Sequence, residues 1–358
     1  MHLLFLHSGD RLPSPRFRVF PFVRRLRQEG HRCRLAPSFP EKYDYIPRIG
    51  FRPSQWLKQL VRAGHLLEFR LRRFDAVIID RELFDFDSHF WEDRFRRACK
   101  TLILDVDDGI FLRYPEKYAH LASISDAVIA GNRAIADYTC AFNDNVTVIP
   151  TCIDLDEYPV RNPPTESRQL PIIGWIGTTG NVPFLDVCAS ALRRLSQRIP
   201  FELRVIAGDS TPLQSIDLTG VSHRFVLWEP ETAVHELSDF DIGLMPLPAG
   251  QAWMEYKCGL KLLQYMSVGI PGVASPIGVN TEIVCDGVNG FLASTSDEWE
   301  AALELLLTDA PLRHRLGTSA RLTVESEYSL DVQFPRYVAV LNQAIERSDD
   351  SETHGTGR

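Results

Sequence analysis

The sequence predicts an α/β protein with two Rossmann-like domains, whose parallel sheets face a central cleft. Short apolar runs alternate with helical patterns along the chain, as they do in parallel α/β proteins. The alternation stops at a polar, proline-rich stretch over residues 159–170 and then starts again. The length of 358 residues is sufficient for two domains that each have a core.

The predicted N-terminal domain covers residues 1–158, and residues 159–170 form the predicted linker. A helix over Phe17–Glu29 follows the first strand and stops at Gly30. The predicted strands of this domain are Leu3–His7, Ala76–Asp80, Leu102–Val106, Ala127–Ala130 and Val146–Ile149, and a second helix covers Arg133–Phe142.

The predicted C-terminal domain covers residues 171–330. Residues 331–347 are expected to form a helix that packs back toward the N-terminal domain, and the polar residues 348–358 a disordered tail. The predicted strands are Ile172–Ile176, Leu203–Ala207, Phe225–Leu227, Ile242–Met245 and Gly272–Ala274, and a helix runs from Pro183 to Arg198.

The composition is that of a globular protein, with 44% apolar and 24% charged residues. The net charge of -8 argues against nonspecific binding to nucleic acids. No apolar run is long enough for a transmembrane helix, and the first residues do not resemble a signal peptide. Seven scattered cysteines without a C-x-x-C pair disfavour a disulfide framework or a zinc site. We therefore expect a cytoplasmic protein.

The segment Tyr256–Met266 contains a glycine, Gly259, at the point where a short helix is expected to begin. A helix N-terminus presents free N–H groups and a partial positive charge, which favour an anion. Lys257 and Lys261 lie one helical turn apart and would reinforce this site for a phosphate or diphosphate. The alternative is an amphipathic core helix with two solvated lysines.

The turn after the predicted strand Ile172–Ile176 is rich in glycine and hydroxyl groups, which let a backbone approach a phosphate closely. It lacks the Gly-Lys-Ser/Thr of a P-loop, and tight packing explains its glycines equally well. Trp228 and Glu229 follow another strand and could hold a nucleobase, or Trp228 could be a packing residue. The candidate residues in the turn are Gly177, Thr178, Thr179 and Asn181.

Several segments together resemble the carboxyl-terminal half of the retaining family 4 glycosyltransferases, which have the GT-B fold. The resemblance is strong over residues 172–328. It implies transfer of a sugar from a UDP- or GDP-linked donor, held by the second domain, to a glycan, lipid-linked or small-molecule acceptor bound by the first. It also implies retention of configuration, no cofactor and no obligatory metal. The segments are Ile173–Gly177, Leu237–Pro246, Gly259–Met266, Gly269–Pro271, Gly278–Val284 and Asp286–Leu292.

The chain departs from this family at the pair of glutamates that flank the donor helix. Tyr256 takes the first position, with Glu255 one residue away, and Gln264 takes the second and could hold the ribose. The basic pair expected in the first glycine loop is also missing. We infer that Lys257 and Lys261 supply the lost charge. The expected donor-binding residues are Gly177, Thr178, Thr179, Asn181, Trp228, Glu229, Glu255, Tyr256, Gly259, Leu260, Lys261 and Gln264.

In the first domain, Asp105-Val106-Asp107-Asp108 follows a strand. Asp107 and Asp108 are candidate catalytic residues together with Lys257, because a carboxylate can stabilise positive charge on the reacting sugar. A D-x-D metal site and a simple turn cluster are the alternatives.

Arg16, Arg18 and Arg81 are candidate acceptor-binding residues, although solvated arginines would give the same pattern. Arginines at positions 24, 25 and 27 could meet an anionic membrane surface that carries a lipid-linked acceptor, so peripheral contact with the inner face of the membrane is a further hypothesis. A noncatalytic scaffold that binds sugar nucleotides and a sugar-nucleotide epimerase are the alternatives to a glycosyltransferase.

Overall fold

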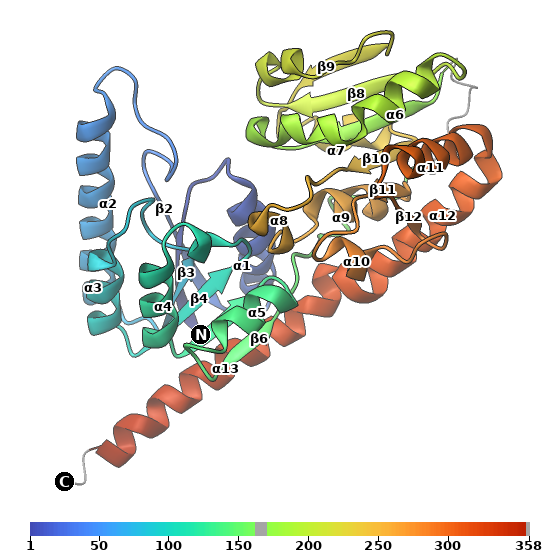
Figure 1. Ribbon diagram of the computed structural model, residues 1–358. Coiled ribbons are helices and arrows are strands. Elements are labelled where there is room, and N and C mark those ends of the chain that lie inside the picture. Colours follow the sequence, from blue (N-terminus) through green and yellow to red (C-terminus); the bar gives the residue numbers. More distant parts are fainter. Residues whose placement is uncertain (162–169, 356–358) are drawn as a thin grey trace. The chain divides into compact units, whose positions relative to one another are not determined.

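The computed structural model describes residues 1–161 and 170–355 (Figure 1). Most of the predicted linker 159–170 and the end of the predicted tail therefore lie outside the described residues. Contacts divide the chain into two compact units. The first unit comprises Met1–Cys152, Tyr256–Cys258 and the segment from Leu330 onward, and the second comprises Ile153–Glu255 and Gly259–Ser329.

The first unit is built on a six-stranded sheet in the order β2-β1-β3-β4-β5-β6, in which every neighbouring pair is parallel. All five strands predicted for this region are confirmed. The edge strand β2 was not predicted, because alternating arginines mask its short apolar pattern. The strands are β1 (His2–His7), β2 (Arg32–Pro37), β3 (Ala76–Asp80), β4 (Thr101–Val106), β5 (Ala127–Ala130) and β6 (Val146–Val148).

Helices cover both faces of this sheet. On one face they bury side chains such as Phe69, Phe95 and Tyr118, and on the other Phe22 stacks on Tyr337 with ring centroids 4.2 Å apart. The helix predicted over Phe17–Glu29 is a π-helical turn, Pro15–Val19, followed by an α-helix. The helices are α1 (Phe20–Gln28), α2 (Phe51–Leu71), α3 (Phe90–Ala98), α4 (Pro115–Ile124), α5 (Arg133–Thr139) and α13 (Leu330–Gly355).

Helix α13 packs against α1 and β4 of the first unit. It continues past residue 348, where the sequence predicts the tail to begin, as far as Gly355. A short 3₁₀ turn, Ile110–Leu112, follows β4. Among the residues described by the structure, no helix combines the length and the apolar character that crossing a bilayer requires.

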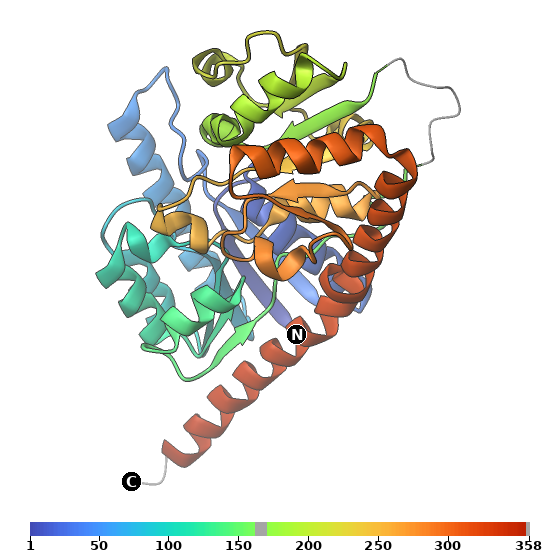
Figure 2. The same cartoon turned by 45° about the vertical axis from the view of Figure 1, so that its right-hand side comes forward.

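The second unit also has six parallel strands, in the order β12-β11-β10-β7-β8-β9 (Figure 2). The five strands predicted here are confirmed, and the fold class of two α/β units with parallel sheets is therefore confirmed as well. The strands are β7 (Ile172–Ile176), β8 (Glu202–Ala207), β9 (His223–Leu227), β10 (Ile242–Met245), β11 (Gly272–Ala274) and β12 (Gly290–Leu292).

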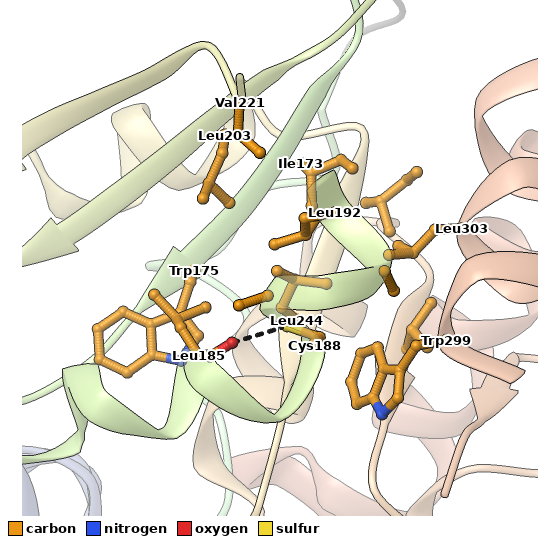
Figure 3. Close-up of a cluster of buried hydrophobic side chains, with 14 of the residues drawn as sticks. Ile173, Trp175, Leu185, Cys188, Leu192, Leu203, Val221, Leu244, Trp299 and Leu303 are labelled. Atoms are coloured by element: carbon orange, nitrogen blue, oxygen red, sulfur yellow. Dashed lines mark hydrogen bonds between the residues drawn. The ribbon is translucent and has the colours of Figure 1, made fainter. Parts of the chain in front are cut away.

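Several helices of the second unit bury a large apolar cluster against the second sheet. Figure 3 shows Trp175 of β7 at one end of this cluster and Trp299 at the other, with Leu192 between them. The predicted helix Pro183–Arg198 is a 3₁₀ turn, Thr179–Leu185, followed by α6. The helices are α6 (Asp186–Ser196), α7 (Ala233–Ser238), α8 (Ala252–Glu255), α9 (Leu260–Ser267), α10 (Asn280–Ile283), α11 (Ser296–Thr308) and α12 (Ala310–Thr323), and two further turns are Thr211–Ser215 and Val324–Tyr328.

Glycines in the strands let α9 lie close to the second sheet. A Cβ at Gly243 would lie 2.2 Å from the ring of Tyr265, and one at Gly272 would lie 2.6 Å from Leu262. The Tyr265 hydroxyl accepts a hydrogen bond from the Ile176 amide (3.1 Å) and donates one to the Leu244 carbonyl (3.1 Å). These contacts fix the position of α9 relative to β7 and β10.

Candidate functional site

In the second unit, the turn after β7 meets the first turn of α9. A Cβ at Gly177 would lie 2.6 Å from Cε of Lys261, so the lysine side chain passes directly over this glycine. The Lys261 ammonium lies 5.4 Å from the centre of the Trp175 ring, which gives a cation–π contact. The structure thus brings together two predicted residues, Gly177 and Lys261. Trp175 was missed, because nothing in the sequence shows that its ring reaches a lysine in a later segment.

The amino end of α9 can bind an anion. Gly259 has a φ of +63°, and a Cβ there would also lie 2.4 Å from Ile283. Glycine is therefore required at this position both for its backbone conformation and for space. Among the described residues, no side chain caps this helix, so its first amides and the positive end of its dipole are available to a ligand. Leu260, the next predicted residue, is half-buried.

The other predicted residues of the glycine-rich turn lie at the same edge of the second sheet. Thr178 is exposed, Asn181 is half-buried, and the Thr179 hydroxyl oxygen lies 3.1 Å from where a Cβ of Gly208 would stand. Trp228 follows β9 and is half-buried, and Glu229 is exposed. Because β7, β8 and β9 are adjacent and parallel, their carboxyl ends lie side by side. The role of these residues in donor binding remains a prediction.

The side chain of Gln264 faces a partner within the second unit. It is buried, and its amide nitrogen donates a hydrogen bond to the Tyr158 hydroxyl (2.9 Å). The amide nitrogen thus has a partner within the second unit, and the role of Gln264 in donor binding stays a prediction. Glu255 is exposed instead, and its carboxylate accepts a hydrogen bond from the Gly278 amide (3.1 Å).

Tyr256 belongs to the first unit, where its ring packs edge-on against Phe111 with centroids 4.7 Å apart. Gly109 leaves room for it, because a Cβ there would lie 3.1 Å from the tyrosine. The Asn132 side chain caps α5 and also donates a hydrogen bond to the Tyr256 carbonyl (3.0 Å). The ring of Tyr256 thus packs within the first unit, and its expected contact with the donor stays a prediction. Sequence reasoning did not find Asn132, because an N-cap asparagine has a sufficient local explanation.

The predicted carboxylates of the first unit lie together where β3 and β4 end. Asp107 accepts hydrogen bonds from Arg81 and from the Ser14 hydroxyl (3.1 Å), and Asp108 lies 3.8 Å from Arg81. Ser14 also donates to Asp80 (2.7 Å). Arg81 has a φ of +59°, which is unusual for a side chain of this size and holds its guanidinium over the carboxylates.

The two candidate catalytic carboxylates have pKa values that are shifted in opposite directions. Burial alone would raise the pKa of Asp107, but Arg81 and Arg18 outweigh it and the pKa is lowered. For Asp108, burial prevails over the attraction of Arg81 and Lys257, so its pKa is raised. Lys257 is thus close enough to act on Asp108, and the structure assembles the three predicted catalytic residues, Asp107, Asp108 and Lys257, within the first unit. Whether they act in catalysis remains a prediction.

The three candidate acceptor-binding arginines have different environments. Arg18 is 1% exposed, donates to Asp105 (2.8 Å) through Nε, and donates to the Ile149 carbonyl (2.6 Å) through Nη1. Its guanidinium is buried and hydrogen-bonded within the first unit, which corrects the expectation that Arg18 binds the acceptor. Arg16 is half-buried, and Arg81 is half-buried against Asp107. Arg81 is thus bound to the catalytic candidates.

A different group of side chains has the composition of a metal site. His89 and His120 lie 2.8 and 2.7 Å from the carboxylate of Asp93, and their rings are 3.9 Å apart. These residues come from α3, its N-cap and α4. Among the described residues, this is the one group of three or more potential ligands. Asp107 and Asp108 do not belong to it.

Comparison with known proteins agrees with this geometry. Residues 170–309 match the family model described as Glycosyl transferases group 1, and this segment therefore carries the domain that the model describes. A D-inositol 3-phosphate glycosyltransferase from Stackebrandtia nassauensis is 28% identical over 223 residues, which are 55% of this chain. The match covers 49% of that relative, so this chain spans about half the length of the curated relative it matches.

Solved structures share the fold over nearly the whole chain. Anabaena HepE, in complex with UDP and glucose, superposes with a TM-score of 0.67 at 15% identity and covers 96% of this chain and 100% of its own. Sucrose-phosphate synthase from Thermosynechococcus elongatus gives a TM-score of 0.74 at 14% identity and covers 96% and 99%. These likenesses establish the GT-B fold.

Proposed function

We propose that the protein is a glycosyltransferase that moves a sugar from a UDP- or GDP-linked donor to an acceptor with retention of configuration. The observation that carries this proposal is the meeting of Lys261 and Gly177 at the open amino end of α9. A diphosphate would receive backbone N–H groups, a helix dipole and an ammonium there. This place lies inside the segment matched by the family model, and HepE holds UDP.

The second unit would hold the donor, and Asp107, Asp108 and Lys257 of the first unit would act on the reacting groups. Catalysis would come from stabilising the leaving diphosphate and orienting the acceptor, without an obligatory metal. The acceptor is a glycan, a lipid-linked compound or a small molecule. A lipid-linked acceptor would bring the protein into peripheral contact with the inner face of a membrane.

Nucleotide binding tests this function directly. A panel of UDP, GDP and UDP-glucose is added while thermal unfolding is followed, since a ligand that binds the folded state raises the melting temperature. The double variant Lys257→Ala, Lys261→Ala should lose the response to the preferred nucleotide. Lys100→Ala is the matched control, because Lys100 stands before β4, at the opposite end of a strand. Unchanged nucleotide affinity in the double variant would contradict the assignment.

Turnover is tested with acceptors of each class, including D-inositol 3-phosphate, because the curated relative is named for that compound. The structure gives one specific reason for an alternative, a noncatalytic scaffold. Tyr256 and Gln264, which replace two family glutamates, are both engaged in packing or buried hydrogen bonds. Nucleotide binding without transfer to any acceptor and without hydrolysis would favour the scaffold.

A further inference from the structure

Helix α2 of the first unit has an apolar exposed face, and over its first half the face that it buries is polar, the reverse of an ordinary surface helix. Farther along the helix, Leu66 and Phe69 are buried in the ordinary way. Ser54, Lys58 and Arg62 lie on the buried side and are at most 1% exposed. On the opposite side, Trp56 is 73% exposed and Leu60 is 68% exposed. Figure 1 shows α2 at the left edge of the drawing, beside α3.

Hydrogen bonds from the buried side fix the rotation of α2. The Lys58 ammonium donates to two loop carbonyls, those of Lys42 and Asp44, both at 2.7 Å. The Arg62 guanidinium donates to the carbonyls of Ala36 (2.8 Å) and His7 (2.9 Å), where β2 and β1 end. Turning the helix to hide its apolar side would leave these charges without partners, at a high cost. The outward apolar face is therefore enforced.

The apolar side chains form one continuous stripe. Trp56, Leu60, Leu67 and Leu71 are separated by four, seven and four residues, which places them on the same side of a helix. The stripe is about 22 Å long at the rise of an α-helix. Nine of the nineteen large hydrophobic side chains exposed among the described residues lie between Phe39 and Leu71. An apolar patch of this extent marks an interaction surface.

Over residues 44–75, five exposed arginines outnumber two exposed carboxylates, those of Asp44 and Asp75, although the chain as a whole carries a net charge of -8. The nearest carboxylate on α2, that of Glu68, is paired with Arg34 (3.0 Å). The arginines of α1 are less suitable, since Arg25 pairs with Asp331 (3.3 Å) and Arg27 donates to the Cys33 carbonyl (2.8 Å). The exposed arginines at the two ends of α2 are Arg48, Arg52, Arg70, Arg72 and Arg73, of which Arg72 also pairs with Glu68 (3.6 Å).

We propose that α2 docks on an anionic lipid bilayer. The stripe enters the boundary between head groups and acyl chains, with the helix parallel to the membrane plane, and the arginines contact lipid phosphates. Trp56 and Phe51 are aromatic residues of the kind that favour this boundary. The proposal names the surface that makes the peripheral contact and to that extent rests on the proposed function. It replaces the arginines of α1 with α2 as the contact.

Sedimentation with vesicles tests the proposal. The full chain is mixed with vesicles of phosphatidylcholine alone or with an equal part of phosphatidylglycerol, and the bound fraction is measured. We expect binding to the anionic vesicles that weakens at high salt. The variant Trp56→Gln, Leu60→Gln, Leu67→Gln should bind anionic vesicles more than about tenfold more weakly. The reason is that it loses the free energy gained when these three apolar side chains leave water. Leu305→Gln, Leu322→Gln, exposed on the second unit, is the matched control.

Each outcome has a defined meaning. Absence of vesicle binding by the wild type, or equal binding by the α2 variant, overturns the proposal. Light scattering that shows a dimer dissociated by the same variant also overturns it, since a second copy would then cover the stripe. UDP-induced stabilisation is measured in parallel on every variant. Vesicle binding without a nucleotide response would contradict the proposed function instead, so the two failures are distinguishable.

Discussion

The carboxyl edges of the two sheets have opposite chemistry, although both sheets are parallel and six-stranded. The edge of the first sheet carries four aspartates at the ends of β3 and β4, and Arg18, Arg81 and serine hydroxyls bind them. The edge of the second sheet is built from glycines, threonines and the amino end of α9. At the first edge the charged side chains bind one another, whereas the second edge presents backbone amides and a lysine.

This difference separates two uses of polar groups. A buried carboxylate bound by a guanidinium stabilises the fold only while both partners are present. Open amides beside a lysine add little to folding but can bind an added anion. Changes at the first edge should therefore affect stability most, and changes at the second edge should affect ligand binding most.

The largest effect is expected from Arg18→Met. It leaves Asp105 buried without its partner, which should cost about 3–5 kcal/mol of unfolding free energy. Urea unfolding, with hydrogen exchange to read the first unit separately, measures this loss. The double variant Arg18→Met, Asp105→Leu should recover most of the stability, because neither charge of this pair is then left buried without the other. A double variant as unstable as the single one would contradict the assignment of the loss to Asp105.

The first unit should also lose stability on acidification. Burial, together with Arg62 and Arg34, lowers the pKa of His65 on α2 from 6.5 to about 4. Between these two pKa values, His65 is protonated in the unfolded chain but neutral in the folded chain. The free energy of unfolding therefore decreases as the pH drops from 6.5 toward 4, by up to about 3 kcal/mol. Unfolding free energies of the wild type and His65→Gln across this range measure the effect. If the free energy of unfolding changed with pH in the same way for both proteins, the loss of stability would not come from His65.

A smaller effect is expected at the second edge, from Gly177→Ala. Its Cβ would lie 2.6 Å from Lys261 and 2.7 Å from Trp175, so the lysine must move away from the turn. We expect the affinity for UDP to fall by about tenfold, because this is the effect of losing one charge-assisted hydrogen bond between Lys261 and the diphosphate. Calorimetric titration with UDP measures this change. Gly180→Ala in the same turn is the control, since a Cβ there meets no atom within 4 Å, and its affinity should be unchanged.

The sequence predicted the buried parallel strands well, because such strands are continuous apolar runs between turn residues. Helix α2 was missed because it places Lys58 and Arg62 toward the interior, so the periodicity on which prediction depends is reversed. Strand β2 was missed because exposed arginines, Arg32 and Arg34, occupy alternate positions of a short edge strand. The burial of Arg18 could not be predicted either, because its partner Asp105 is distant in sequence and lies beside it only in the folded structure.

The candidate site was predicted in part. Gly177, Gly259 and Lys261 could be proposed from the sequence because phosphate binding requires glycine and positive charge in recognisable local patterns, and the structure brings Gly177 and Lys261 together. The environment of Tyr256 was not predicted, because contacts with Asn132 and Phe111 join segments more than a hundred residues apart. Local sequence carries no information about such pairs.

The smallest effect concerns Cys258, which shows how firmly residues 256–258 are held at the first edge. Its thiol donates to the Asp107 carbonyl (3.1 Å), and burial and the Asp107 carboxylate raise the pKa of Cys258 to about 12. The reactive thiolate is therefore scarce at pH about 8. Timed alkylation followed by mass spectrometry should label exposed Cys140 early and Cys258 much later. Asn132→Ala removes the amide donor to Tyr256 and should speed labelling of Cys258 without changing that of Cys140. Equal labelling of Cys258 and Cys140 in the wild type would mean that this segment is mobile rather than part of the edge.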